Sequence, residues 1–335
     1  MKKIEIYDVS LRDGNHAKKH QISLGQIEKY CIDADKAGVD VVEVGHGNGI
    51  GASSLQVGLA KHTDAEMLLT ARKFLKDSKL SVHCMPGFAT VSRDVKNALE
   101  CGADIIRIGC HCTEATVTKT HLNFLRNNNI TAYASLMMVH MASKETLLEE
   151  CKKLESYGAQ KITLMDSAGY LLPKDVQEVI SFLNSNLEIN VGFHSHNNLE
   201  VAIANSLAAV EAGSDIIDAS ICGFGAGAGN TRMEVLIAVL KRMGYETNVD
   251  LYRILDAADH AEQYLLQNLP KATSTSIVSG LSGVFSGFLK HVQRISKLYS
   301  VDQRDVFFEL GKRKAVGGQE DLIVDVAKSL SSQDS

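Results

Sequence analysis

The sequence predicts an α/β fold of the (β/α)8 TIM-barrel type, followed by a C-terminal helical extension. Eight short runs rich in β-branched residues alternate with amphipathic helical patterns. Four of the units resemble each other closely, reading "KAGVDVVEV", "ECGADIIRI", "SYGAQKITL" and "EAGSDIIDA", which indicates a repeated module of helix, glycine turn and buried strand. Eight such modules are the number that closes a barrel.

The expected strands recur along the first two thirds of the chain. They are residues 4–10, 39–45, 80–85, 104–110, 131–138, 161–167, 190–195 and 215–221. Helical patterns such as 23–38 and 143–158 separate them, each beginning at a capping serine and ending at a glycine. A doubly wound open sheet is the alternative, but no G-x-G-x-x-G motif follows the first strand, and eight strands close more naturally.

The pattern changes after the last barrel helix. Residues 249–267, 279–299 and 304–314 have helical patterns with no strand between them. We therefore expect a TIM-barrel catalytic domain over 1–260 and a helical C-terminal domain over 261–335, the latter as a region that contacts a partner.

Composition narrows the class of protein. A hydrophobic content of 45% and a charged content of 22% fit a soluble globular protein, and a net charge of -5 gives no reason to expect nucleic-acid binding. No apolar run approaches the roughly 20 residues of a membrane span, and the N-terminus lacks a signal-peptide core, so we expect a cytoplasmic protein without membrane contact. The seven scattered cysteines favour reduced thiols over a disulfide framework.

Three residues at predicted strand ends could bind a metal ion. Strand side chains alternate between faces, so His194 and His196 point the same way at the end of the seventh strand. Asp13 follows the first strand, two places away around a ring of eight, and functional groups of such barrels lie at this rim. Two imidazoles and one carboxylate leave positions open on a divalent ion. The alternative is a hydrogen-bonded histidine pair near the barrel mouth.

Two further residues flank Asp13. The fixed charge of Arg12 could stabilise a carboxylate or a developing enolate, or it could simply pair with a buried acid such as Glu43 or Asp166. His16 is the expected proton carrier, because imidazole titrates near neutral pH, with a capping or surface role as the alternative.

Other motifs carry less chemistry. The loop "GFGAGAGN", residues 223–230, lacks the ending of a Walker motif and is interpreted as close backbone packing over the site. Cys110, His111 and Cys112 lack a second cysteine pair at zinc-site spacing and are interpreted as structural. The same structural or exposed role is expected for His20, His62, His83, His121, His140, His260 and His291.

With these residues assembled, the chain resembles the 4-hydroxy-2-oxovalerate aldolase family. This family belongs to the DRE-TIM metallolyases, with isopropylmalate synthase and hydroxymethylglutaryl-CoA lyase. The resemblance covers almost the whole chain, and "HCTEA", "LMMVHM" and "VGGQED" are closer to the aldolase branch. It rests on the motifs "DVSLRDGNHAKKHQ", "VEVGHGNG", "HCTEA", "LMMVHM", "DSAG", "HSHNNL", "GAGAGN" and "ELGKRKAVGGQEDLIVDVA".

The resemblance implies retro-aldol cleavage of a 4-hydroxy-2-oxoacid to pyruvate and a short aldehyde. It implies a divalent ion, usually manganese with magnesium or cobalt possible, held by Asp13, His194 and His196 and acting as a Lewis acid on the 2-oxo acid. Arg12 would help to stabilise the pyruvate enolate, and His16 would take the proton of the 4-hydroxyl. Ser167 matches a substrate-contacting position, and Asn230 matches an asparagine near the metal.

One position departs from the family pattern. Members commonly carry Tyr in "GVYSSFLRH", whereas this chain reads "GVFSGFLKH", with Phe285 at that place in the substrate-binding region. A hydroxyl that would orient the 4-hydroxyl or the aldehyde is missing, so stereochemistry and aldehyde identity are open. The family also implies an acylating acetaldehyde dehydrogenase partner that receives the aldehyde through a channel. The apolar helix near Phe285 could serve that partner, cover the barrel or form a homo-oligomer.

Two other functions compete with the aldolase. A Claisen-type synthase would use a similar metal site to join acetyl-CoA to a 2-oxo acid, but the aldolase-branch motifs argue against it. An inactive barrel that only stabilises a dehydrogenase would require a broken site, whereas Arg12, Asp13, His16, His194 and His196 are all intact.

Overall fold

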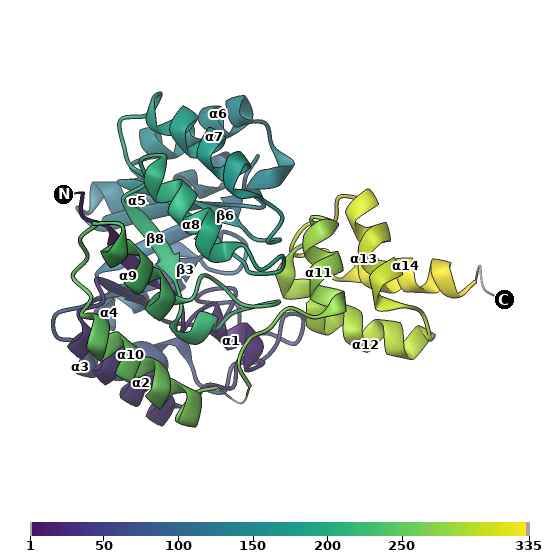
Figure 1. Cartoon of the computed structure of the whole chain (residues 1–335), viewed down its shortest axis with the longest axis horizontal. Coiled ribbons are helices and arrows are strands. Elements are labelled where there is room, and N and C mark those ends of the chain that lie inside the picture. Colours follow the sequence, from purple (N-terminus) through teal and green to yellow (C-terminus); the bar gives the residue numbers. More distant parts are fainter. Residues whose placement is uncertain (1, 267, 333–335) are drawn as a thin grey trace.

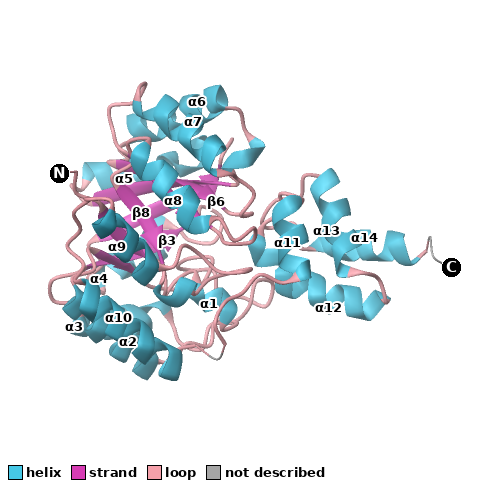
Figure 2. Cartoon of the chain, viewed as in Figure 1, coloured by secondary structure: helices cyan, strands magenta, loops and turns pink. Residues whose placement is uncertain are grey.

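Eight parallel strands close into a barrel in the order of the sequence, which confirms the predicted (β/α)8 fold. The computed structural model describes residues 2–266 and 268–332 (Figures 1 and 2). The strands are β1 Glu5–Asp8, β2 Val41–Glu43, β3 Lys79–Cys84, β4 Ile105–His111, β5 Thr131–Met137, β6 Lys161–Asp166, β7 Val191–Ser195 and β8 Ile216–Ala219.

The helices around the barrel begin and end where local chemistry directs them. Ser23 caps the second helix through the amide of Gln26, and Gly38 ends it with φ +80°, as the sequence pattern predicts. Ser143 and Gly158 bound the sixth helix in the same way. These helices are α1 Gly14–Ala17, α2 Leu24–Ala37, α3 Asp64–Phe74, α4 Lys96–Glu100, α5 Lys119–Asn127, α6 Lys144–Tyr157, α7 Pro173–Asn184, α8 Ala202–Glu211, α9 Met233–Arg242 and α10 Leu251–Tyr264.

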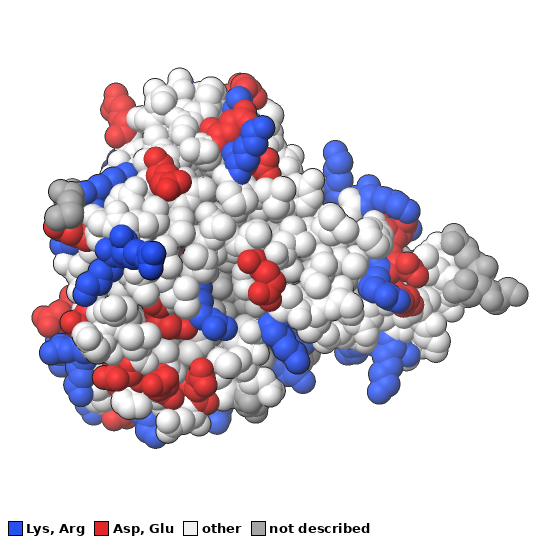
Figure 3. Space-filling view, viewed as in Figure 1, with Lys and Arg blue, Asp and Glu red and all other residues white. Residues whose placement is uncertain are grey.

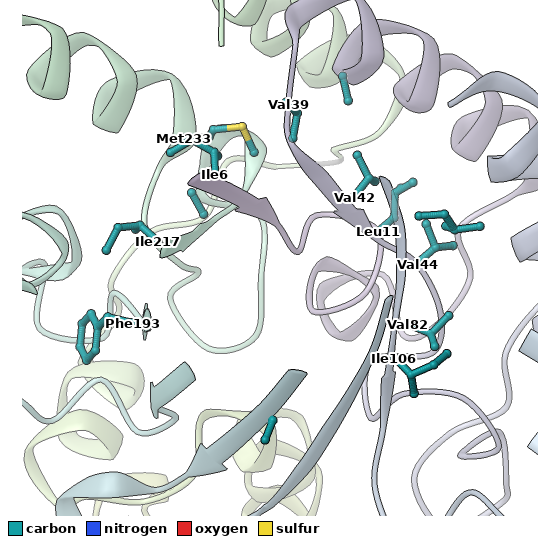
Figure 4. Close-up of a cluster of buried hydrophobic side chains, with 14 of the residues drawn as sticks. Ile6, Leu11, Val39, Val42, Val44, Val82, Ile106, Phe193, Ile217 and Met233 are labelled. Atoms are coloured by element: carbon teal, nitrogen blue, oxygen red, sulfur yellow. The ribbon is translucent and has the colours of Figure 1, made fainter. Parts of the chain in front are cut away.

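The main hydrophobic core lies between the strands and the surrounding helices. Ile6, Val42, Val82 and Ile106 contribute to it from the first four strands (Figure 4). The neighbouring residues in each strand point into the barrel, where a much smaller apolar cluster forms. Much of the remaining interior is polar, and this is the side of the strands that carries the candidate site.

The C-terminal helices form a second packed unit. They are α11 Ser274–Leu281, α12 Leu289–Tyr299, α13 Gln303–Lys312 and α14 Asp321–Ser331, with a short 3₁₀ turn, η5, at Ser286–Phe288. Their own hydrophobic cluster is separate from that of the barrel, and Figure 1 shows them projecting from one side of it. Helix α10 instead packs on α2 and belongs to the barrel core, so the predicted boundary at 260/261 lies within this helix.

The remaining features of the fold are the state of its cysteines, the character of its helices and the distribution of its surface charge. All seven cysteines are buried and unpaired. Among the described residues, no helix is long and apolar enough to cross a membrane. On the face seen in Figure 3, acidic and basic side chains are interspersed over the barrel and the helical unit.

Candidate metal centre and active site

Asp13, His194 and His196 meet at the carboxyl ends of β1 and β7. All three side chains are buried, and each offers one ligand atom within 4.8 Å of the others. The Nε2 atoms of His194 and His196 are 3.3 Å apart. Alternation along β7 and closure of the ring therefore bring together the three residues expected from the sequence, while their role as metal ligands stays a prediction.

The two imidazoles face each other through their Nε2 atoms. The Nδ1 atom of His194 lies 3.0 Å from Asp218 Oδ2, and because a carboxylate can only accept, Nδ1 is the donor and Nε2 is the nitrogen that faces His196. Burial lowers the pKa of His196 to about 4, which leaves this ring neutral near pH 7. Two adjacent imidazoles beside a carboxylate form a site that a cation would satisfy.

Asp13 is held ionised and oriented by its neighbours. Burial alone would raise the pKa of its carboxyl, but His196 and Arg12 hold that pKa well below its usual range. Its Oδ2 atom accepts hydrogen bonds from the amide of Ala226 at 3.0 Å and from Asn230 Nδ2 at 2.9 Å. The 223–230 loop thus packs over the site as expected, and it also fixes this carboxylate.

Arg12 is both paired and partly free. Its Nε donates to Glu43 at 2.7 Å and its Nη1 to Asp13 at 2.9 Å, so one alternative considered from the sequence, an ion pair with Glu43, is present. Its Nη2 atom is buried and has no hydrogen-bond partner in the described part of the chain. That nitrogen remains available as a donor to a bound molecule.

His16 belongs to a group of histidines at the mouth. Its ring lies over Gly47, where an added Cβ would come within 2.6 Å of it. The ring of His20 makes an edge contact with His16 and stacks on His46 with centroids 3.6 Å apart. Burial lowers the pKa of His16 from its usual value, so the ring is neutral near pH 7. His20 is buried and adjoins the candidate base, and its expected structural role stays a prediction.

Ser167 links the barrel to the helical unit, whereas Phe285 packs within that unit. The Ser167 hydroxyl accepts from the amide of Met138 at 3.2 Å, and its carbonyl accepts from the amide of Ser286 at 3.0 Å. Phe285 makes an edge contact with Phe288 and packs against the cluster of the helical unit. Their predicted role in substrate binding stays a prediction.

The donor set fits a divalent metal ion. Two nitrogens bound at right angles at about 2.1 Å lie about 3 Å apart, close to the His194–His196 separation of 3.3 Å. A carboxylate supplies the third ligand, and three protein ligands leave positions open for a substrate. Asp218, bonded to the far nitrogen of His194, is the supporting contact that metal-bound histidines usually have.

Three buried charged residues adjoin the site. Arg107 and Asp218 were not predicted from the sequence, and Glu43 was predicted only as a possible partner of Arg12. Arg107 and Asp218 lie inside the barrel and bond to each other at 2.7 Å, and Arg107 also bonds to Glu43. A charged residue in the middle of the apolar runs "DIIRI" and "DIIDA" was a signal for them. It indicates an inward-facing polar position but does not identify the partner.

Comparison with known proteins places the chain. A family model described as HMGL-like matches residues 3–260, and a second, the DmpG-like communication domain, matches residues 270–332. Together with the barrel and its Asp–His–His cluster, these matches define a barrel enzyme of the carbon–carbon lyase class. A 4-hydroxy-2-oxovalerate aldolase of Spirochaeta aurantia is 56% identical over 330 residues, or 98% of this chain and 97% of that protein. The chain belongs to the 4-hydroxy-2-oxovalerate aldolase family.

Further matches agree with this assignment. The 4-hydroxy-2-oxovalerate aldolase of Pectobacterium atrosepticum is 52% identical, covering 99% of this chain and 97% of that protein. The carboxyl transferase domain of Rhizobium etli pyruvate carboxylase, solved with pyruvate and biocytin, superposes with a TM-score of 0.83 at 16% identity over 100% of this chain and 61% of that one, which shows the shared fold. The family resemblance expected from the motifs is thereby confirmed, and the family implies a divalent metal.

Proposed function

We propose that this chain cleaves 4-hydroxy-2-oxovalerate, or a similar 4-hydroxy-2-oxoacid, to pyruvate and a short aldehyde by retro-aldol chemistry. The observation that carries the proposal is the buried cluster of Asp13, His194 and His196 in a chain 56% identical to a named aldolase. The proposed division of the chain is a catalytic barrel domain that includes α10 and a helical domain that begins after it, because the boundary expected at 260/261 lies within α10.

Asp13, His194 and His196 would hold the ion, for which we propose manganese, with magnesium and cobalt as alternatives. When bound, a divalent ion supplies Lewis acidity to the 2-oxo acid. The cluster supplies one carboxylate and two imidazoles and leaves positions open for oxygen ligands, which suit manganese, and the absence of thiolates from the cluster disfavours softer metals.

Arg12 would bind and stabilise the reacting 2-oxo group. Its Nε and Nη1 bonds to Glu43 and Asp13 fix the plane of the guanidinium. The unpartnered Nη2 can then donate to a substrate oxygen, on which negative charge grows as the C3–C4 bond breaks. A donor fixed before the reaction stabilises this charge without reorganisation.

His16 would take the proton of the 4-hydroxyl. As that proton leaves, the electron pair of the O–H bond forms the aldehyde carbonyl, the C3–C4 bond breaks, and its electron pair passes to pyruvate as an enolate. Protonation at C3 completes the reaction. The lowered pKa of His16, caused mainly by burial, keeps the ring unprotonated and able to act as the base.

The helical unit would bind an acylating acetaldehyde dehydrogenase that receives the aldehyde through a channel. The match of residues 270–332 to a communication domain supports this role. Leu281, Leu298 and Phe308 are large apolar side chains that this unit exposes, as a protein-binding surface would.

The activity test measures pyruvate release from racemic 4-hydroxy-2-oxovalerate with added Mn²⁺. We expect release that a chelator and the Asp13→Ala substitution both abolish. Coenzyme A release from acetyl-CoA with a 2-oxo acid, without pyruvate formation from the hydroxyacid, would instead identify a synthase and refute the aldolase.

The partner test measures binding of the acylating acetaldehyde dehydrogenase from the same organism. Phe308→Asp should weaken the complex while free pyruvate release continues. Tyr252→Asp is the matched control, because Tyr252 is also exposed but lies on α10 of the barrel. Equal weakening by both, or by neither, would contradict this surface.

A further inference from the structure

Arg107 is a buried arginine that has no part in the proposed reaction steps, and it lies between Glu43 and Asp218, two carboxylates that contact the site. Arg107 is on β4 and is fully buried inside the barrel. Its Nε and Nη2 donate to the two Glu43 oxygens at 2.8 Å each, and its Nη1 donates to Asp218 at 2.7 Å. Its Cζ also lies 4.0 Å from the centroid of the Tyr7 ring. Barrel interiors usually contain branched apolar side chains, so this charge has a cost that a function must justify.

Both carboxylates bound by Arg107 also bind a residue of the site. Glu43 Oε1 accepts from Arg12 Nε at 2.7 Å, and Asp218 Oδ2 accepts from His194 Nδ1 at 3.0 Å. Arg107 is therefore the shared neighbour of the residue that positions the proposed substrate donor and of the residue that orients a proposed metal ligand. Without its charge, two acids would lie buried with little compensation.

We propose that Arg107 is a positioning residue for the metal centre and for Arg12. Through Asp218 it fixes the ring orientation and the Nδ1–H tautomer of His194, so that Nε2 faces the ion. Through Glu43 it fixes the plane of Arg12. The inference rests on the proposed function, because it takes Asp13, His194 and Arg12 in the roles given above.

The shape of the arginine head group is what this role requires. Three nitrogens of one planar group bridge two carboxylates on different strands, β2 and β8. A lysine ammonium keeps the charge but is a single point that cannot hold both carboxylates in fixed directions. Arg107→Lys therefore separates charge from geometry, and a purely space-filling role would not predict a defect in metal binding.

The first experiment titrates the purified full-length chain with Mn²⁺ and follows the free ion by electron paramagnetic resonance. We expect Arg107→Lys and Asp218→Asn each to weaken Mn²⁺ binding by about 10- to 100-fold, the usual effect of removing a support of a metal ligand. The double variant should bind no more weakly than Asp218→Asn alone, because both act through the same hydrogen bond.

Lys161→Met is the matched control. Lys161 pairs with Glu5 at the opposite end of the barrel, where β1 and β6 begin, and it has no contact with Arg107 among the described interactions. This substitution should lower thermal stability but leave Mn²⁺ affinity unchanged. If Mn²⁺ binding is weakened in this control as well, loss of a charge from the barrel would act on metal affinity only by destabilising the fold, and the proposal would be overturned.

Kinetics at saturating Mn²⁺ separate the effect of Arg107 through Asp218 from its effect through Glu43. Asp218→Asn should recover most of its kcat, because its defect is in metal binding. Arg107→Lys should keep a raised KM for the 2-oxo acid, because Arg12 has lost its fixed partner. If Arg107→Lys does not fold, Glu43→Gln and Asp218→Asn test the two effects one by one, and wild-type KM in the first or wild-type Mn²⁺ affinity in the second overturns the inference.

Asp13→Ala distinguishes failure of this inference from failure of the proposed function. A wild-type chain that binds no Mn²⁺, or that binds it equally well with Asp13→Ala, refutes the metal centre itself. Binding that Asp13→Ala abolishes but that folded Arg107→Lys and Asp218→Asn both retain overturns the role of Arg107 alone.

Discussion

The imidazole of His16 determines how the proposed reaction should respond to pH. A general base must be unprotonated, so activity is lost as the pH falls through the pKa of this ring. Burial is the largest influence and lowers that pKa below the usual 6.5, although Asp13 opposes the shift. We expect the acidic limb of the kcat/KM profile to have its midpoint below pH 6.5.

His16→Ala should remove that limb and lower kcat by roughly 10²- to 10⁴-fold, the usual contribution of a positioned base. Mn²⁺ affinity, measured in the same preparations, should change little. A variant that retains the wild-type rate and the same acidic limb would show that another group accepts the proton.

Phe285 offers a test of stereochemical control. The ring packs edge-on beside Phe288 at a partly buried place, and Phe285→Tyr adds only a para-hydroxyl to it. Phe285→Tyr should change the ratio of kcat/KM for the two enantiomers of 4-hydroxy-2-oxovalerate by roughly 2- to 10-fold, the value of one hydrogen bond. Identical ratios in both proteins would exclude this position from substrate recognition.

The 223–230 loop controls Asp13 through its backbone conformation. Gly229 has φ +94°, and a Cβ there would lie 2.2 Å from the carbonyl oxygen of Gly223. Gly229→Ala must therefore displace the loop that carries Ala226 and Asn230, the two donors to Asp13. We expect Mn²⁺ affinity to fall by about tenfold or more, as when other supports of a metal ligand are lost.

Gly244→Ala is the control for this loop. Gly244 also has a left-handed backbone, with φ +83°, but an added Cβ would meet nothing within 4 Å. The substitution should cost about 1 kcal/mol or more of stability through backbone strain and leave metal binding intact. Equal Mn²⁺ affinity for both alanine variants would refute the role of the loop.

The regular elements were predictable because their signals are local. Ser23 and Gly38 bound one helix in sequence and in structure, and the spacing of His194 and His196 is enough to place both on one face of a strand. Strand ends shifted by a few residues, since the pairing that ends a strand depends on its neighbour in the ring.

The polar interior was not predictable in the same way. Arg107 and Asp218 come from β4 and β8, strands on opposite sides of the ring, and neither sequence run identifies the other as its partner. The stack of His20 on His46 likewise joins two irregular segments with no period to read. Such contacts depend on the closed barrel as a whole, whereas Asp13 could be placed from ring order alone.

The stability of the whole fold should depend on the buried carboxyl of Asp8. Burial raises its pKa from 3.8 to about 6, although Ser10 and Tyr30 donate to it. A raised pKa means that the folded state holds the proton more tightly, so the stability gained at low pH is lost as the pH rises from about 4 through 6. The full difference corresponds to about 3 kcal/mol.

Asp8→Asn cannot ionise, so its free energy of unfolding should lack this component. Urea denaturation between pH 4 and pH 7 should show the variant gaining on the wild type by up to about 3 kcal/mol as the pH rises. Asp77→Asn, at an exposed position, should follow the wild type throughout. Parallel curves for wild type and Asp8→Asn would contradict the shift.

The positions of the buried cysteines allow an alkylating reagent to distinguish the barrel from the helical unit. Every thiol lies at or before residue 222, so the barrel holds all seven and the helical unit none. Burial also raises the pKa of these thiols, Cys84 and Cys112 to about 12, and suppresses the reactive thiolate. Labelling therefore requires the barrel to open and does not respond to unfolding of the helical unit, so the mass gained over time reports the opening of the barrel alone.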